Sequence, residues 1–102
     1  MKVKKAFNNT TVTAASTTVD ITLDVYPFTD VIQAYVEHNQ TGGTKGVKIY
    51  GRLHPSLSFQ LLNNITNTST TKWYTITPCA EYRVEINNTG GGSMTASCYL
   101  MR

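Results

Sequence analysis

The chain has 102 residues, of which 40% are apolar and only 15% are charged, and its formal net charge is +3. This length suits one domain with one hydrophobic core, and abundant Thr, Asn and Ser are typical of strand surfaces and turns. No segment approaches the ~20 consecutive apolar residues of a membrane-spanning helix, so we expect no membrane contact.

The N-terminal segment holds a cluster of positive charge at Lys2, Lys4 and Lys5, with Val3 and Phe7 as its large apolar residues. We expect residues 1–9 to form an arm or an edge strand, and residues 10–102 to form a single β-sandwich domain. No apolar signal-peptide core follows the charges, so we expect synthesis in a cytoplasm. Nucleic-acid binding needs a clustered basic face with interleaved aromatic residues, so we expect no nucleic-acid partner.

Alternation of apolar and polar residues predicts strands along most of the chain, because a period of two places one strand face in the core. In chain order, the predicted strands cover residues 10–15, 18–25, 31–37, 47–53, 59–65, 73–77, 82–87 and 93–101. The Gly-rich segments 39–46 and 88–92 are predicted to be hairpin loops. Seven to eight short strands with closely spaced turn signals predict an all-β, antiparallel sandwich of the jelly-roll type.

The residues that could carry catalysis are few. His38 and His54 are interpreted as loop histidines, because they lack the spacing of metal ligands. Cys98 lies in phase with the inner face of its strand, so a buried free thiol is favoured over a disulfide. Cys79 follows Pro78 at a strand end and is expected to be partly exposed, but no motif activates it as a nucleophile.

Carboxylate pairs and phosphate loops offer no better candidates. Asp20 and Asp24 share one strand face about 13 Å apart, which exceeds the separations that glycosidases use. The glycines at 90–92 lack the Lys-Ser/Thr and the helix of a phosphate-binding loop. We therefore expect no catalytic residues, no metal and no cofactor, and we expect that the protein is not an enzyme.

Aromatic residues are the stronger candidates for a binding surface. Five of them could stack on sugars or anchor a protein interface, although cross-strand packing and burial in the core would also explain them: Tyr35, Tyr50, Trp73, Tyr74 and Tyr99. Tyr35 and Tyr50 flank the same predicted hairpin and lie opposite the apolar face of their strands. The candidate interface comprises Lys2, Lys4, Lys5, Phe7, Tyr35, Tyr50 and Trp73.

The second half of the chain contains a V-x-I-x-G strand, an aromatic residue after a polar turn, a Y-R-V-x-I strand, a Gly-rich loop and a closing T-A strand. The residues are Val47, Ile49 and Gly51, then Phe59, then Tyr82, Arg83, Val84 and Ile86, then 90–92, then Thr95, Ala96 and Leu100. In this order of pieces, and in its opening residues 11–16 and 19–25, the chain resembles a family of small β-sandwich proteins from tailed-bacteriophage virions. It departs from that family after Gly51, where residues 52–56 replace an Asn-Asp-Gly-type turn and Phe59 replaces a tryptophan.

The resemblance implies a non-enzymatic structural role in a virion, and an accessory capsid (decoration) protein is the first expectation. The expected partners are the major capsid protein or other virion proteins, together with further copies of the chain, with a trimer favoured. The N-terminal arm is expected to reach a neighbour after synthesis in the host cytoplasm. The alternatives are a tail, neck or baseplate component, or a glycan-binding receptor-recognition module that uses Tyr35, Tyr50 or Trp73.

Overall fold

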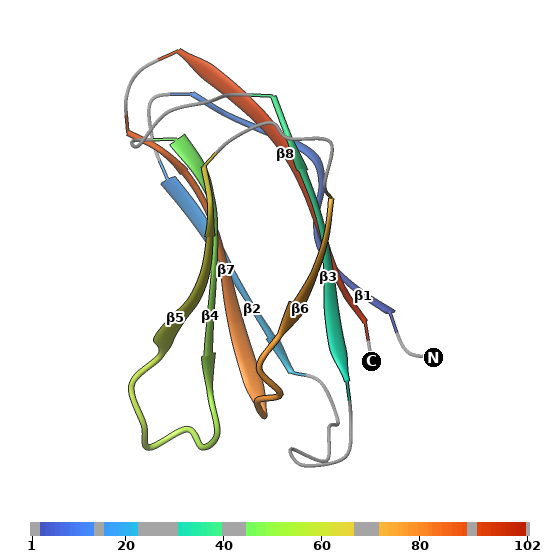
Figure 1. The fold of residues 1–102 in the computed structure, drawn as a ribbon. Helices are drawn as coiled ribbons and strands as arrows, with labels where there is room; N and C mark the ends of the chain where they lie inside the picture. Colours follow the sequence, from blue (N-terminus) through green and yellow to red (C-terminus); the bar gives the residue numbers. More distant parts are fainter. Residues whose placement is uncertain are drawn as a thin grey trace.

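The computed structural model describes residues 3–13, 16–22, 31–39, 45–66, 72–89 and 92–101. These residues form eight strands and no helix (Figure 1). The strands are β1 (Val3–Thr13), β2 (Ser16–Thr22), β3 (Ile32–His38), β4 (Lys45–Arg52), β5 (Gln60–Ile65), β6 (Trp73–Ile76), β7 (Glu81–Asn88) and β8 (Ser93–Met101). Asp24, within the predicted strand 18–25, lies outside the described residues.

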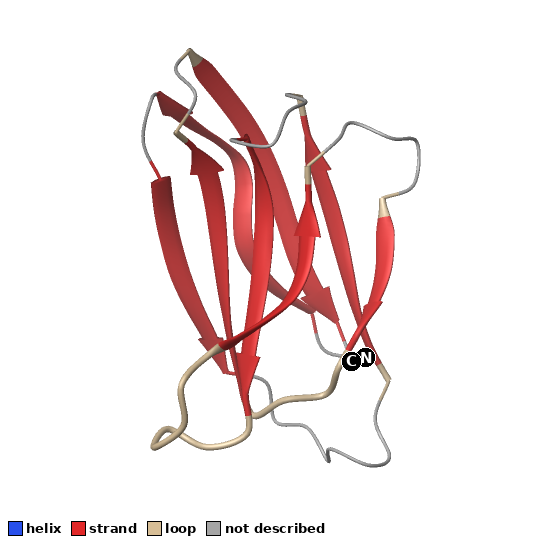
Figure 2. Ribbon diagram, turned by 60° about the vertical axis from the view of Figure 1, so that its left-hand side comes forward, coloured by secondary structure: helices blue, strands red, loops and turns tan. Residues whose placement is uncertain are grey.

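The strands form two four-stranded antiparallel sheets that pack face to face, with loops at the two ends of the sandwich (Figure 2). The strand order is β1-β8-β3-β6 in the first sheet and β2-β7-β4-β5 in the second. Successive strands alternate between the sheets everywhere except at β4 and β5. This interleaved order of eight strands is that of a jelly roll, which confirms the predicted fold class.

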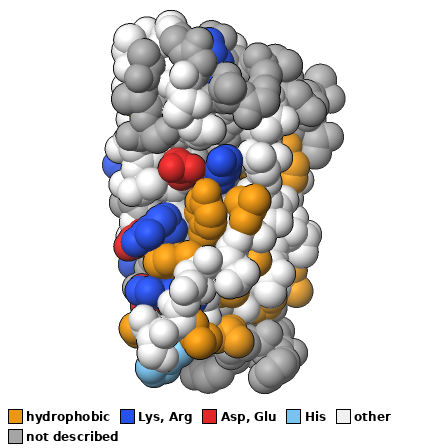
Figure 3. All heavy atoms as spheres, turned by 90° about the vertical axis from the view of Figure 1, so that its left-hand side faces the viewer, with side chains coloured by type: hydrophobic (Ala, Val, Ile, Leu, Met, Phe, Trp, Pro, Cys, Tyr) orange, Lys and Arg blue, Asp and Glu red, His pale blue; other side chains and the backbone are white. Residues whose placement is uncertain are grey.

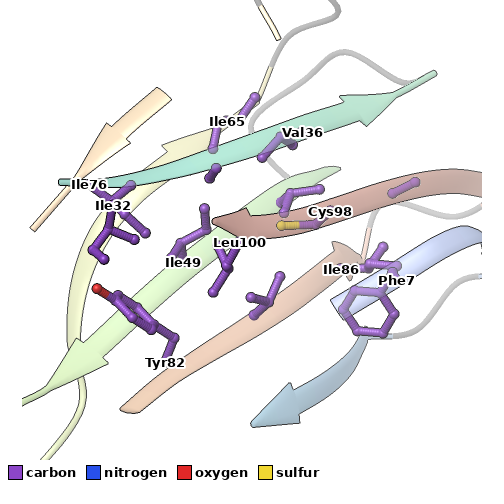
Figure 4. Close-up of a cluster of buried hydrophobic side chains, with 14 of the residues drawn as sticks. Phe7, Ile32, Val36, Ile49, Ile65, Ile76, Tyr82, Ile86, Cys98 and Leu100 are labelled. Atoms are coloured by element: carbon purple, nitrogen blue, oxygen red, sulfur yellow. The ribbon is translucent and has the colours of Figure 1, made fainter. Parts of the chain in front are cut away.

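The core lies between the sheets and is built by period-two alternation on the central strands. In β7, Tyr82, Val84 and Ile86 are fully buried, and in β8 Met94 and Leu100 are fully buried (Figure 4). Residues between them in sequence point to the outer faces of the sheets. The alternation in β3, β4, β7 and β8 therefore predicted the inward residues correctly.

The two Gly-rich segments are not β-hairpins. β3 lies in the first sheet and β4 in the second, so segment 39–46 crosses between the sheets, and the same holds for β7, β8 and segment 88–92. Residues 40–44 and 90–91 lie outside the described residues. Alternation shows which side of a strand is buried but not which strand lies beside it, and both kinds of loop favour glycine. The predicted hairpins were therefore wrong.

The N-terminal residues belong to the sandwich itself. β1 crosses the boundary predicted between residues 9 and 10 and pairs along β8 at the edge of the first sheet. The side chain of Phe7 is only 8% exposed and points between the sheets with the other core residues (Figure 4). Its placement in the candidate interface was wrong, because a register shift between Lys5 and Phe7 reverses the alternation of side chains in β1 and turns this ring inward.

Candidate functional site

An aromatic row crosses the outer face of the first sheet from strand to strand. Lys5 of β1 is the direct partner of Tyr99 in β8, Tyr99 pairs with Tyr35 in β3, and Tyr35 pairs with Trp73 in β6. Directly opposite residues in antiparallel strands hold their Cβ atoms about 4.5–5.5 Å apart. The register therefore places three aromatic rings and one lysine side by side on one face. We call Lys5, Tyr99, Tyr35 and Trp73 the aromatic row.

The rings of the aromatic row contact one another in favourable geometries. The Tyr35 and Trp73 ring centroids are 5.2 Å apart with an interplanar angle of 68°, an edge-to-face arrangement. The Tyr35 and Tyr99 centroids are 6.5 Å apart at 58°. Trp73 is nevertheless 55% exposed, so much of the largest ring in the row still faces solvent.

Charged groups border the row. The Tyr35 hydroxyl donates to Glu37 Oε2 at 2.8 Å, and Lys72 Nζ lies 3.4 Å from the same oxygen. These two contacts, with the Tyr35 hydroxyl the larger cause, lower the pKa of the Glu37 carboxyl, and the same carboxylate raises the pKa of Tyr35. An exposed aromatic centre with a charged rim is the composition of a protein-interaction surface.

The structure brings together only part of the candidate interface proposed from sequence. Lys5, Tyr35 and Trp73 lie in the aromatic row, and Lys4 is exposed on β1. Lys2 lies outside the described residues. Tyr99 completes the row; it was among the aromatic candidates but not in the candidate interface, although its position out of phase with Cys98 and Leu100 in β8 was the available signal.

Tyr50 lies on the other side of the molecule. It belongs to β4, and its hydroxyl approaches Glu85 Oε1 of β7 at 3.4 Å on the outer face of the second sheet. The expectation that Tyr35 and Tyr50 share one surface was wrong, because it depended on a β3–β4 hairpin. The two tyrosines instead mark two separate outer faces.

Both cysteine thiols are buried. Cys98 is fully buried, and burial raises the pKa of its thiol to about 12. Cys79 is only 5% exposed and its pKa is also raised by burial, so the expected partial exposure was wrong. Both cysteines are free, as favoured for Cys98. A buried thiol with a raised pKa carries little of the thiolate that acts as a nucleophile.

The histidines and carboxylates form no metal cluster in the described part of the chain. His38 is the last residue of β3 and is buried, so its interpretation as a loop residue was wrong. His54 lies in the turn between β4 and β5, where its Nδ1 accepts a hydrogen bond from the Ser56 amide at 3.1 Å. That contact gives His54 a local role in shaping the turn.

Comparison with known proteins finds no matching family model, no matching curated protein and no matching solved structure. Within the described ranges, no helix is long and apolar enough to cross a membrane. The resemblance to tailed-phage virion proteins stays a prediction from the sequence.

Proposed function

We propose that this chain is a non-enzymatic structural protein of a tailed-phage virion, and that it is an accessory capsid (decoration) protein. The aromatic row is the observation that carries the proposal. It exposes Trp73 beside the half-buried Tyr35 on the outer face of the first sheet, and tryptophan and tyrosine are among the residues that contribute most to protein binding. The partner is the major capsid protein or another virion protein.

The arrangement of the row supports a protein partner. Its rings are already held by ring contacts and by the Tyr35–Glu37 hydrogen bond, so binding would order few side chains. Lys5 at one end and the Glu37–Lys72 pair near the other supply both signs of charge for fixing orientation. Self-association, with a trimer favoured, and assembly on the particle after synthesis in the host cytoplasm belong to the same proposal.

The test is occupancy of virions that lack this protein. Purified protein is added back to such particles, and copies per particle are measured by gel densitometry and by cryo-electron microscopy. We expect wild-type protein to bind at symmetric sites and Trp73→Ala to weaken binding at least about tenfold, as loss of an interface hot spot does. Leu61→Ala, at a residue 52% exposed on the other sheet, is the matched control.

Three results would count against the proposal. Full occupancy by the double variant Tyr35→Ala/Trp73→Ala would show that the row is not the contact. Density for the chain at the neck, tail or baseplate would replace decoration by the alternative location. Failure of wild-type protein to associate with any virion component would remove the virion role. Deletion of residues 1–8 is not a suitable test, because it removes Phe7 from the core.

A further inference from the structure

A groove of about 630 Å³ opens on the outer face of the second sheet, opposite the aromatic row. Figure 3 shows this face, with hydrophobic side chains in its middle and Lys, Arg, Asp and Glu side chains beside them. Strands β2, β4 and β7 supply its floor, and the loop between β4 and β5 supplies one wall. Its lining includes Thr18, Tyr50, Arg52, Phe59, Arg83 and Glu85.

The wall of the groove is held in place by two arginines. The guanidinium of Arg52 lies 4.2 Å from the centroid of the Phe59 ring, and that of Arg83 lies 4.4 Å from it. Cation–π contacts at this distance are favourable. Arg52 also donates from Nη1 to the carbonyls of Pro55 and Leu57, at 3.2 and 3.3 Å. The β4–β5 loop is therefore tied to the sheet in a defined position.

Each arginine that lines the groove is paired with a carboxylate outside the lining. Arg83 donates to Asp20 from Nε at 2.8 Å and from Nη2 at 3.1 Å, a two-point contact. Arg52 donates to Glu81 at 3.0 Å, and Lys48 is the direct cross-strand partner of Glu85. Among the described residues of this face, three cations therefore stand against three carboxylates. A phosphate, sulfate or nucleic-acid chain would therefore have to compete with Asp20 and Glu81 for the two guanidiniums.

Fixed charges of both signs beside an aromatic ring suit a neutral ligand that carries many hydroxyls. Each sugar hydroxyl can donate to a carboxylate such as Glu85 and accept from a guanidinium such as Arg83. The C–H face of a pyranose ring can stack on the aromatic ring of Tyr50. The volume lies within the ~300–1,000 Å³ typical of small-molecule sites. We propose that this groove binds a neutral oligosaccharide, independently of the protein-binding role of the aromatic row.

The test is a nuclear magnetic resonance titration of the ¹⁵N-labelled protein. The probes are maltohexaose, cellohexaose, chitohexaose and mannohexaose, each at about 10 mM so that millimolar dissociation constants are detected. Sialyllactose and a heparin hexasaccharide serve as anionic comparisons. We expect at least one neutral probe to shift the amides of Tyr50, Phe59 and Arg83, and the anionic probes to shift none of them.

Variants assign the shifts to the groove. Tyr50→Ala removes the stacking ring, and we expect about tenfold weaker binding. Glu85→Gln removes one carboxylate while keeping the side-chain shape, so it tests the hydroxyl contacts if Tyr50→Ala does not fold. Trp73→Ala, on the opposite face, is expected to bind as wild type does. An intact amide spectrum of each variant confirms the fold.

Several results would overturn the inference. These are no shift with any neutral probe, shifts with the anionic probes alone, or binding that survives both groove variants. Loss of binding in Trp73→Ala with retention in Tyr50→Ala would move the sugar site to the aromatic row. Virion occupancy is measured in a separate experiment, so failure of this inference can be told apart from failure of the proposed function.

Discussion

The hydroxyl of Tyr82 donates a hydrogen bond to the carbonyl of Thr77 at 2.8 Å. The same oxygen accepts a hydrogen bond from the amide of Cys79 at 2.8 Å. Tyr82 lies near the start of β7 and is fully buried, and the two backbone groups belong to the connection from β6. One side chain thus fixes the crossing from the first sheet to the second, as the tyrosine corner does in immunoglobulin-type sandwiches.

Tyr82→Phe should lower the free energy of unfolding by about 1–3 kcal/mol. The substitution keeps the ring in the core but leaves the Thr77 carbonyl and the Cys79 amide without their shared partner. Urea unfolding followed by circular dichroism measures the effect. Tyr99→Phe, on the outer face of the first sheet, is the matched control and should stay within about 0.5 kcal/mol of wild type. Equal effects of the two substitutions would contradict a structural role for the Tyr82 hydroxyl.

Phe7→Ala should destabilise the fold by about 3–5 kcal/mol, because it removes a large buried side chain and leaves a cavity in the core. Lys5→Ala, two residues earlier on the exposed face of the same strand, should change stability by less than about 0.5 kcal/mol. Thermal and urea unfolding of both variants measure the difference. Wild-type stability of Phe7→Ala would mean that the N-terminal segment is an arm rather than a strand of the sandwich.

The sequence was sufficient to predict which residues of the central strands face the core. Alternation is a local property, so the inward positions of Ile49 in β4 and Val84 in β7 follow from their neighbours along the chain. Strand pairing is not local, and the glycines of segment 39–46 suit a hairpin as well as a crossing between sheets. Tyr35 and Trp73 could be chosen singly as exposed aromatic residues, but their contact depends on the β3–β6 pairing, which only the fold provides.

Two glycines of β4, Gly46 and Gly51, lie too close to their neighbours for a larger residue, and the contacts at Gly46 are the less able to move. A Cβ atom at Gly46 would lie 2.5 Å from the backbone oxygen of Ile65. A Cβ atom at Gly51 would lie 2.6 Å from Cys79 Sγ and 2.8 Å from Leu62 Cδ1, which are side-chain atoms that can move. Both Ala substitutions should destabilise by about 1–3 kcal/mol, with Gly46→Ala the more severe.

The double variant Gly51→Ala/Cys79→Ala tests the contact at Gly51, because it removes the sulfur atom that the new methyl group would meet. It should unfold at a higher urea concentration than the sum of the single substitutions predicts. Strict additivity of the two substitutions would show that the Gly51 contact with Cys79 is not what limits side-chain size at this position.

The two thiols should react slowly with Ellman's reagent in the native protein at about pH 8, because the reagent attacks thiolates and both thiols are buried. Cys98, with a pKa raised to about 12, should react more slowly than Cys79. Both should react at once in denaturing urea. The reaction rate of N-acetylcysteine is the reference for an unprotected thiol. If Cys79 in the native protein reacted at that rate, the β6–β7 connection would have to open readily.

The Asp20–Arg83 pair should make stability depend on pH in a defined direction. The hydrogen bonds from Arg83 hold the pKa of Asp20 below its ordinary value. A carboxyl whose pKa is lower in the folded state than in the unfolded state stabilises the fold above the unfolded pKa. That contribution is lost as pH falls through the folded pKa. Asp20→Asn should therefore destabilise at neutral pH by at most about 1 kcal/mol, because the pair is half-exposed and screened by solvent.

Urea midpoints of wild type and Asp20→Asn at a series of pH values measure this dependence. The difference between the two proteins should be constant above about pH 5 and should shrink toward zero as Asp20 of the wild type is protonated. High salt should reduce the difference at neutral pH, since it screens exposed charges. Thr11→Ala, which removes a 2.9 Å hydroxyl contact with Thr95 and no titrating group, should give a difference that does not vary with pH. A difference for Asp20→Asn that stayed constant down to the lowest pH would show that the ion pair with Arg83 does not stabilise the fold.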